Sequence, residues 1–244
     1  MRNLRLDICY EGTRYRGWQR LPNSDQTIQG KIEKVLSRVL NESIEITGSG
    51  RTDSGVHAVG QVANFHCNST MPSEEILQNL RRYLPEDIGI YSCRDVSERF
   101  HARLNARAKT YLYRLWVSDT PCVFERKFVT VIPGELNVEA MRAAAMRLVG
   151  THDFSAFCAN KHMKKSTIRT LFSIDIREEG NELRFYLRGN GFLHNMVRII
   201  VGTLVEVGKG ERSPESVSLL FGGARADAGM LMDPTGLCLM EVEY

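Results

Sequence analysis

Two hydrophobic periods alternate along this chain, and their order is the feature that most constrains its fold. A period of two, typical of a strand, places Leu4, Leu6 and Ile8 on one face of residues 3–10. A period near 3.6, typical of an amphipathic helix, follows over residues 27–40. The same periods predict the other elements of the first half: strands over 44–48, 58–67 and 88–96, and a helix over 73–84. The order β-α-β-β-α-β indicates a ferredoxin-like lobe.

The second half runs a similar course. Strands are expected over 106–117, 168–177, 182–188 and 237–242. Helices are expected over 138–149, 192–207 and 213–221. We therefore predict an α/β (α+β) protein of two tandem ferredoxin-like, or RRM-like, βαββαβ lobes that span residues 1–104 and 105–244. A central cleft between two such lobes would suit a long, flexible substrate.

Composition and charge narrow the class of protein. The 244 residues carry a net charge of +3 and contain no apolar run approaching the roughly 20 residues of a membrane helix. The N-terminus lacks the apolar block of a secretory signal, so we expect an intact cytoplasmic protein without membrane association. The six cysteines form no C-x-x-C pair and the six histidines show no zinc-type spacing. We expect free thiols and no metal.

The segment GSGRTDSGVHAVGQVANF, residues 48–65, holds the strongest candidate for chemistry. Its glycines bracket Asp53 between two predicted strands, and such a loop can hold a carboxylate at a fixed, exposed angle. The alternative is an ordinary turn, because Asp, Ser and Gly are the common turn residues and occupy 53–55. On composition alone the turn is the commoner case.

A second signal lies on the predicted strand 106–117. Four alternate residues share one face of this strand: Arg107, Lys109, Tyr111 and Tyr113. Cations mixed with aromatic rings suit phosphates and splayed bases. An ordinary sheet face, in which tyrosines pack and lysines extend to solvent, explains the same pattern. The two interpretations stand side by side.

The predicted helix 192–207 carries a third signal, because apolar side chains cover more than half its circumference and Arg198 lies in the remaining strip. An arginine on such a helix is seldom buried without a carboxylate partner. Pairing with Glu206 at the surface would explain it without any function. Elsewhere, basic clusters suited to an RNA backbone include Arg14, Arg16, Lys164 and Lys165.

Distinctive motifs lie along nearly the whole chain: YEGTRYRGWQ at 10–19, GSGRTDSGVHAVGQV at 48–62, FHAR at 100–103, AKTYLYRL at 108–115 and GNGFLHNMVRIIVGTLVEVGKG at 189–210. Together, and in this order, they resemble the tRNA pseudouridine synthase A family. The resemblance implies two ferredoxin-like lobes that share one large mixed, mostly antiparallel sheet, usually in a homodimer. It also implies conversion of uridine to pseudouridine in the anticodon stem-loop of tRNA, at positions 38, 39 and 40, without a metal or organic cofactor.

Residue roles follow from the same resemblance. Asp53 resembles the nucleophile, and Arg51 resembles the residue that meets the RNA backbone and helps to hold the target nucleotide out. Tyr111 resembles the ring that stacks on the target base, and Arg198 resembles the partner that orients Asp53. Leu237 resembles a wall of the base pocket, although MDPTGL stands here where the family carries a P-P-x-G-L run.

The chemistry leaves several points open. A carboxylate cannot reach the reacting atoms of a stacked uridine, so the base must be flipped out. Asp53 could add to the base or attack the ribose as a retaining glycosidase does, and Tyr111 is a candidate for the later removal of a proton from C5. The alternative from another class is a non-catalytic RNA-binding module of two RRM-like lobes, which would have no use for Asp53 together with Arg198.

Overall fold

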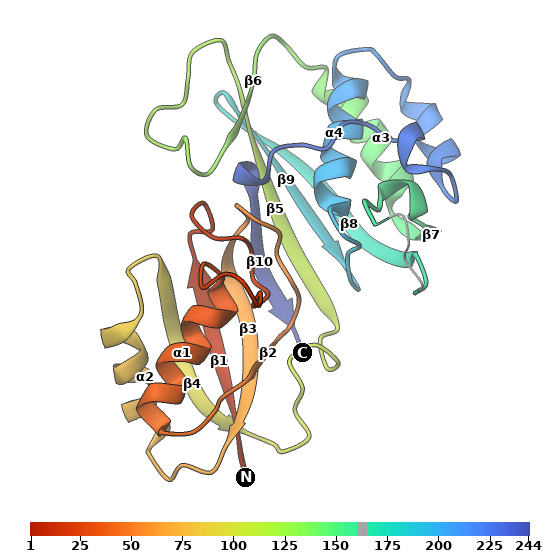
Figure 1. Ribbon diagram of the computed structural model, residues 1–244. Coiled ribbons are helices and arrows are strands. Elements are labelled where there is room, and N and C mark those ends of the chain that lie inside the picture. Colours follow the sequence, from red (N-terminus) through yellow and green to blue (C-terminus); the bar gives the residue numbers. More distant parts are fainter. Residues whose placement is uncertain (161–164) are drawn as a thin grey trace. The chain divides into compact units, whose positions relative to one another are not determined.

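The computed structural model describes residues 1–160 and 165–244 (Figure 1). The chain divides into two compact units. The first comprises Met1–Arg107 and Cys238–Tyr244, and the second comprises Ala108–Leu237. No helix in the described part of the chain is long and apolar enough to cross a bilayer.

The first unit has the β-α-β-β-α-β order that the hydrophobic periods predict. Its strands are β1 (Arg2–Tyr10), β2 (Ile46–Gly48), β3 (His57–Cys67) and β4 (Ile88–Val96), and its helices are α1 (Ile28–Leu40) and α2 (Ser73–Tyr83). β1 lies between β3 and β4 and is antiparallel to both, and β2 is antiparallel to β3. The last strand of the chain, β10 (Leu237–Glu243), runs parallel to β3, with Cys238 opposite His57.

The core of the first unit forms from the faces that the sequence marks as apolar. Leu4, Leu6 and Ile8 of β1 are fully buried. On α1 the equivalent row of apolar residues one turn apart, from Ile28 onward, is buried as well. α1 begins after Thr27, whose hydroxyl accepts a hydrogen bond from the Gly30 backbone N–H at 3.2 Å.

The strands of the second unit pair in the order β5-β9-β8-β7, with β6 parallel to β5. The strands are β5 (Ala108–Val117), β6 (Thr130–Ile132), β7 (Gly150–Asp153), β8 (Ile168–Glu179) and β9 (Glu182–Gly189). Two α-helices, α3 (Val138–Leu148) and α4 (Met196–Gly208), pack against each other. In the described part of this unit, 3₁₀ segments lie at Ser155–Phe157, Pro214–Leu220, Arg225–Asp227 and Pro234–Gly236.

The predicted fold class, α+β with mixed and mostly antiparallel strands, is confirmed, and several boundaries differ. The helix expected from residue 192 begins at Met196, because Asn195 adopts a left-handed backbone with φ 61°. The helix expected over 213–221 is a 3₁₀ helix, capped by Ser213 as the sequence indicated. β6 and β7, of three and four residues, are too short to leave a periodic signal.

The units also divide the chain differently from the expected lobes, 1–104 and 105–244. The first unit continues to Arg107, and it also includes the C-terminal residues Cys238–Tyr244. The reason is the pairing of β10 with β3, which assigns the C-terminal strand to the first unit.

Candidate active site

Asp53 lies in the loop that joins β2 to β3, residues 49–56, which we call the Asp53 loop. Its side chain is half-buried, whereas Arg51 and Ser54 on either side are exposed. The Val56 backbone N–H donates to the Asp53 carbonyl at 3.2 Å, and Gly55 has φ +80°. The Asp-Ser-Gly run is therefore a tight turn, as its composition predicts. This turn places Asp53 shortly before the first residue of β3, His57.

The Asp53 loop is hydrogen-bonded to residues 10–19, the YEGTRYRGWQ motif. The Tyr15 carbonyl accepts hydrogen bonds from the Ser54 hydroxyl at 3.1 Å and from the Gly55 backbone N–H at 3.3 Å. On the other side of Asp53, the Trp18 N–H donates to the Thr52 carbonyl at 3.0 Å. The residues that flank the carboxylate are thus held from both directions by one segment of chain.

Two buried side-chain pairs anchor the loop further. The Tyr10 hydroxyl lies 2.8 Å from the Thr52 hydroxyl, and burial raises the pKa of Tyr10, so that it stays protonated. The Ser49 hydroxyl donates to the Gln61 amide oxygen at 2.7 Å, which ties the start of the loop to β3. A loop fixed at so many points is pre-organised, which is a requirement for a catalytic carboxylate.

The second unit carries Tyr111 on β5. The ring is 8% exposed and meets Phe192 edge to face, with centroids 5.0 Å apart. Tyr113, two residues on, is fully buried, and its hydroxyl donates to the Asp233 carbonyl at 2.6 Å. The two tyrosines share a strand face but differ in surroundings, and for Tyr113 the ordinary packing interpretation of this face is the right one.

Arg198 lies in the first turn of α4 and is 9% exposed. Its Nε donates to the Met232 carbonyl at 2.6 Å, and its Nη1 donates to the Asn195 side-chain oxygen at 2.8 Å. The carboxylate of Glu206, weighed from the sequence as a surface partner for Arg198, instead pairs with Arg212 at 3.1 Å. The guanidinium is therefore oriented by bonds to the turn before α4 and to residue 232.

The segment 232–237 is held by the two side chains just described, because Arg198 binds the carbonyl of residue 232 and Tyr113 binds the carbonyl of residue 233. Asp233, which departs from the family's proline, accepts a hydrogen bond from the Thr235 N–H at 2.9 Å and so caps the short 3₁₀ turn. Leu237 follows this turn and is 5% exposed.

The four cations predicted to meet an RNA backbone have different settings. Arg14 donates through Nε to the Asp87 carboxylate at 2.9 Å, so a phosphate would share this guanidinium. Arg16 and Lys165 are exposed. Lys164 lies outside the described residues.

The candidate residues divide between the two units. Asp53 and Arg51 belong to the first, and Tyr111, Arg198 and Leu237 belong to the second. Sequence reasoning assigned no supporting role to the residues that hold them in place, which in the first unit are Tyr15 and Trp18 and in the second are Asn195, Tyr113 and Met232. For Tyr15 and Trp18 the sequence did offer a signal, which is the pair of glycines in the YEGTRYRGWQ motif, Gly12 and Gly17. Glycines indicate places where another segment of backbone approaches closely.

Residues 8–105 and 144–244 match the family described as tRNA pseudouridine synthase. Among curated proteins, the chain is 46% identical to tRNA pseudouridine synthase A 2 of Bacillus cereus and 47% identical to tRNA pseudouridine synthase A of a Bacillus species, strain KSM-64. It is 44% identical to tRNA pseudouridine synthase A 2 of Clostridium perfringens. Each of these alignments covers 100% of both chains. Among solved structures, a chain of the Cbf5-Nop10-Gar1 complex aligns with 97% of this chain and 48% of its own length, at 12% identity and a TM-score of 0.39.

Proposed function

The chain belongs to the tRNA pseudouridine synthase family, whose members are isomerases, and we propose that it converts uridine to pseudouridine in the anticodon stem-loop of tRNA, at positions 38, 39 and 40, with Asp53 as the nucleophile. The observation that carries this proposal is the attachment of the Asp53 loop. Hydrogen bonds to Thr52, Ser54 and Gly55 fix the backbone on both sides of the carboxylate. This support holds the carboxylate in one position, which a nucleophile requires.

The reaction breaks the N1-glycosidic bond of uridine and forms a C5-glycosidic bond to the same base. The proton on C5 is removed and N1 takes up a proton, so the atoms balance. It is an isomerisation, so no oxidant, reductant or energy source is consumed. Asp53 forms a transient covalent bond, either to the base or to the ribose, and is released when the new glycosidic bond is complete. The uridine must leave its stack before the carboxylate can reach it, so the nucleotide is flipped out.

The other candidate residues take supporting roles in this proposal. Arg51 is exposed two residues before Asp53, where a cation can contact the RNA backbone and hold the flipped nucleotide. Tyr111 stacks on the target base, and its hydroxyl is the candidate for proton removal from C5. Arg198 orients the carboxylate of Asp53, and Leu237 forms a wall of the base pocket.

We further propose that exposed cations, with Arg16 and Lys165 among them, contact the tRNA backbone. A cytoplasmic homodimer belongs to the same proposal, and the resemblance to the family supports it.

The test is Asp53→Asn, a substitution of nearly equal size that removes the nucleophilic charge. We expect turnover to fall by at least about 10⁴-fold, while the dissociation constant for tRNA stays within a factor of a few. Pseudouridine is mapped in tRNA treated with purified enzyme, and binding is measured on the same preparations.

Asp119→Asn, in an exposed turn of the second unit, is the matched control and should keep full activity. Pseudouridine formation by pure Asp53→Asn protein would remove the assignment of the nucleophile. Binding of tRNA without any turnover by the wild type would instead favour the alternative function, a non-catalytic RNA-binding module.

A further inference from the structure

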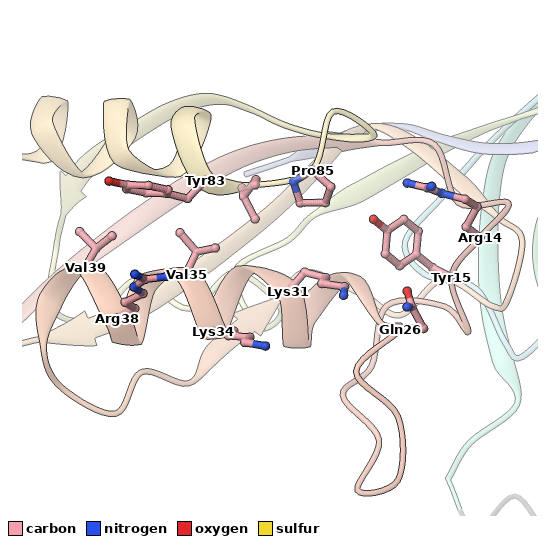
Figure 2. A pocket seen from close by; sticks show the side chains of 11 residues that line it. Arg14, Tyr15, Gln26, Lys31, Lys34, Val35, Arg38, Val39, Tyr83 and Pro85 are labelled. Carbon is pink, nitrogen blue, oxygen red and sulfur yellow. The ribbon is translucent and has the colours of Figure 1, made fainter.

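A pocket of about 650 Å³ lies in the first unit, between α1 and the C-terminal end of α2 (Figure 2). One wall is a face of α1. The opposite wall is formed by Tyr83 and Pro85, and Arg14, Tyr15 and Gln26 close one end. Neither Arg51 nor Asp53 is among the residues that line it. The pocket is therefore a separate feature from the candidate active site.

The α1 wall carries three cations in a row. Lys31, Lys34 and Arg38 are spaced by three and four residues, so their side chains lie on one face of the helix. Seven residues of helix span about 10 Å, which is long enough for the row to meet more than one phosphate of a single strand. Helix α1 needs only its other face for the core, because Ile28, Ile32 and Leu36 are buried there.

Two of the four cations that line this pocket have a carboxylate partner within the described ranges, and two have none. No carboxylate is among the described residues that line it. Arg14 is held by Asp87, and Lys31 lies 3.6 Å from the exposed Asp25. Lys34 and Arg38 are exposed, and the described part of the chain contains no hydrogen bond or ion pair to either side chain. These two cations are available to an anionic ligand.

The pocket also offers a surface for a planar group. Tyr83 is 52% exposed, and the Arg82 guanidinium lies over its ring, 5.5 Å from the centroid. Figure 2 shows the ring across from Val35 and Val39 of α1. An exposed tyrosine is a stacking platform for an unpaired base, and it accepts any base because each has a π-face. Cations beside an accessible ring and an apolar wall match a nucleotide, which combines a phosphate with a base.

We propose that this pocket binds a nucleotide of the substrate tRNA other than the target uridine, with its phosphates on Lys34 and Arg38 and a base against Tyr83. The proposal rests on the proposed function for the identity of the RNA. The pocket supplies affinity and register through Lys34, Arg38 and Tyr83, which lie outside the Asp53 loop, so it acts on binding and leaves the reaction step unchanged.

The variants must leave the Asp53 loop alone. Tyr15 is unsuitable, because its ring lines the pocket while its carbonyl binds Ser54 and Gly55. The double variant Lys34→Gln/Arg38→Gln changes two exposed side chains on a helix surface. Its matched control is Arg99→Gln/Lys209→Gln, which removes the same charge from exposed side chains that form no ion pair in the described part of the chain.

Binding of tRNA is measured as a function of salt, together with single-turnover rates at saturating enzyme. Two lost phosphate contacts should make the log-log salt slope shallower by about 1.4, at about 0.7 for each single-strand phosphate. At 0.1 M salt this corresponds to a dissociation constant about 25-fold higher. Tyr83→Ala should weaken binding by about fivefold or more, whereas Tyr83→Phe keeps the ring and should bind as the wild type does. The single-turnover rate should stay unchanged in every pocket variant.

An unchanged dissociation constant in the double variant would overturn the proposal, and so would an equal loss in the control, since that would reflect net charge alone. Adenosine monophosphate serves as the probe for a free-nucleotide site. If it bound to the wild type and not to the double variant, while tRNA bound to both equally, the pocket would belong to a free nucleotide. Failure of the proposed function has a different signature, which is wild-type protein that binds tRNA and forms no pseudouridine.

Discussion

Tyr111 and Tyr113 show how much a side chain's surroundings decide at the scale of single residues. They are two positions apart on β5 and share one face of the strand. Tyr113 is fully buried and its hydroxyl donates to the Asp233 carbonyl, whereas the Tyr111 ring packs edge to face with Phe192. The hydroxyl of Tyr113 is thus engaged in packing the fold, and the stacking role is proposed for Tyr111, which the resemblance to the family indicates.

Replacing Tyr111 by Phe separates stacking from proton transfer. The ring remains, so we expect tRNA binding to survive, and turnover should fall if the hydroxyl removes the C5 proton. Tyr111→Ala should in addition cost about 1–3 kcal/mol of base stacking. The measurements are single-turnover rates and dissociation constants. A fully active Tyr111→Phe enzyme would restrict this residue to stacking.

Arg198 is held by the Met232 carbonyl and the Asn195 side chain, in directions that a planar guanidinium can satisfy together. Arg198→Lys keeps the charge and loses this geometry, so we expect turnover to fall by about tenfold or more, equivalent to about 1.4 kcal/mol, with little change in tRNA affinity. Arg212→Lys, at the ion pair with Glu206, is the control and should turn over normally. Weaker binding with an unchanged rate on bound RNA would make Arg198 a phosphate contact instead.

At the scale of elements, the segment 10–19 forms hydrogen bonds with the Asp53 loop. It gives the loop backbone partners that the loop lacks within itself, at Thr52, Ser54 and Gly55. The approach is close, because a Cβ on Gly17 would lie 2.6 Å from the Thr52 carbonyl oxygen. The YEGTRYRGWQ motif and the Asp53 loop, the two most distinctive motifs of the N-terminal half, are thus packed directly against each other.

Gly17→Ala should disturb the contact between residues 10–19 and the Asp53 loop. Gly17 has φ +93°, so alanine would be strained by about 1–3 kcal/mol and would also push against Thr52. We expect a lower melting temperature together with reduced turnover. Gly134→Ala is the matched control, since Gly134 has φ +84° but no atom within 4 Å of the added Cβ. It should lose stability and keep its activity, and equal turnover in the two variants would contradict a supporting role for residues 10–19.

At the scale of the whole molecule, the chain passes from the first unit to the second after Arg107 and returns after Leu237. The first unit is therefore incomplete until the last seven residues are present, because β10 pairs with β3. The candidate residues follow the same division, with Asp53 on one stretch of chain and Tyr111 and Arg198 on the other. The proposed chemistry accordingly needs both units, and neither carries all of the candidate residues.

The sequence by itself determined the order of the longer elements and most of their boundaries to within about two residues, because the periods of two and 3.6 are local properties of the chain. β4 was predicted over 88–96 and occupies Ile88–Val96. The sequence also indicated Asp53 as a candidate, because glycines flank it. The YEGTRYRGWQ motif stood out in the sequence as well, but its contact with the Asp53 loop is visible only in the structure. Tertiary structure decided the rest. The start of α4 depends on Asn195 adopting a left-handed backbone while its side chain binds Arg198, and the place of β10 depends on which strand edge it meets. A hydrophobic period states which face of an element is buried, but it carries no information about the partner that buries it, and that partner is chosen only when distant segments pack together.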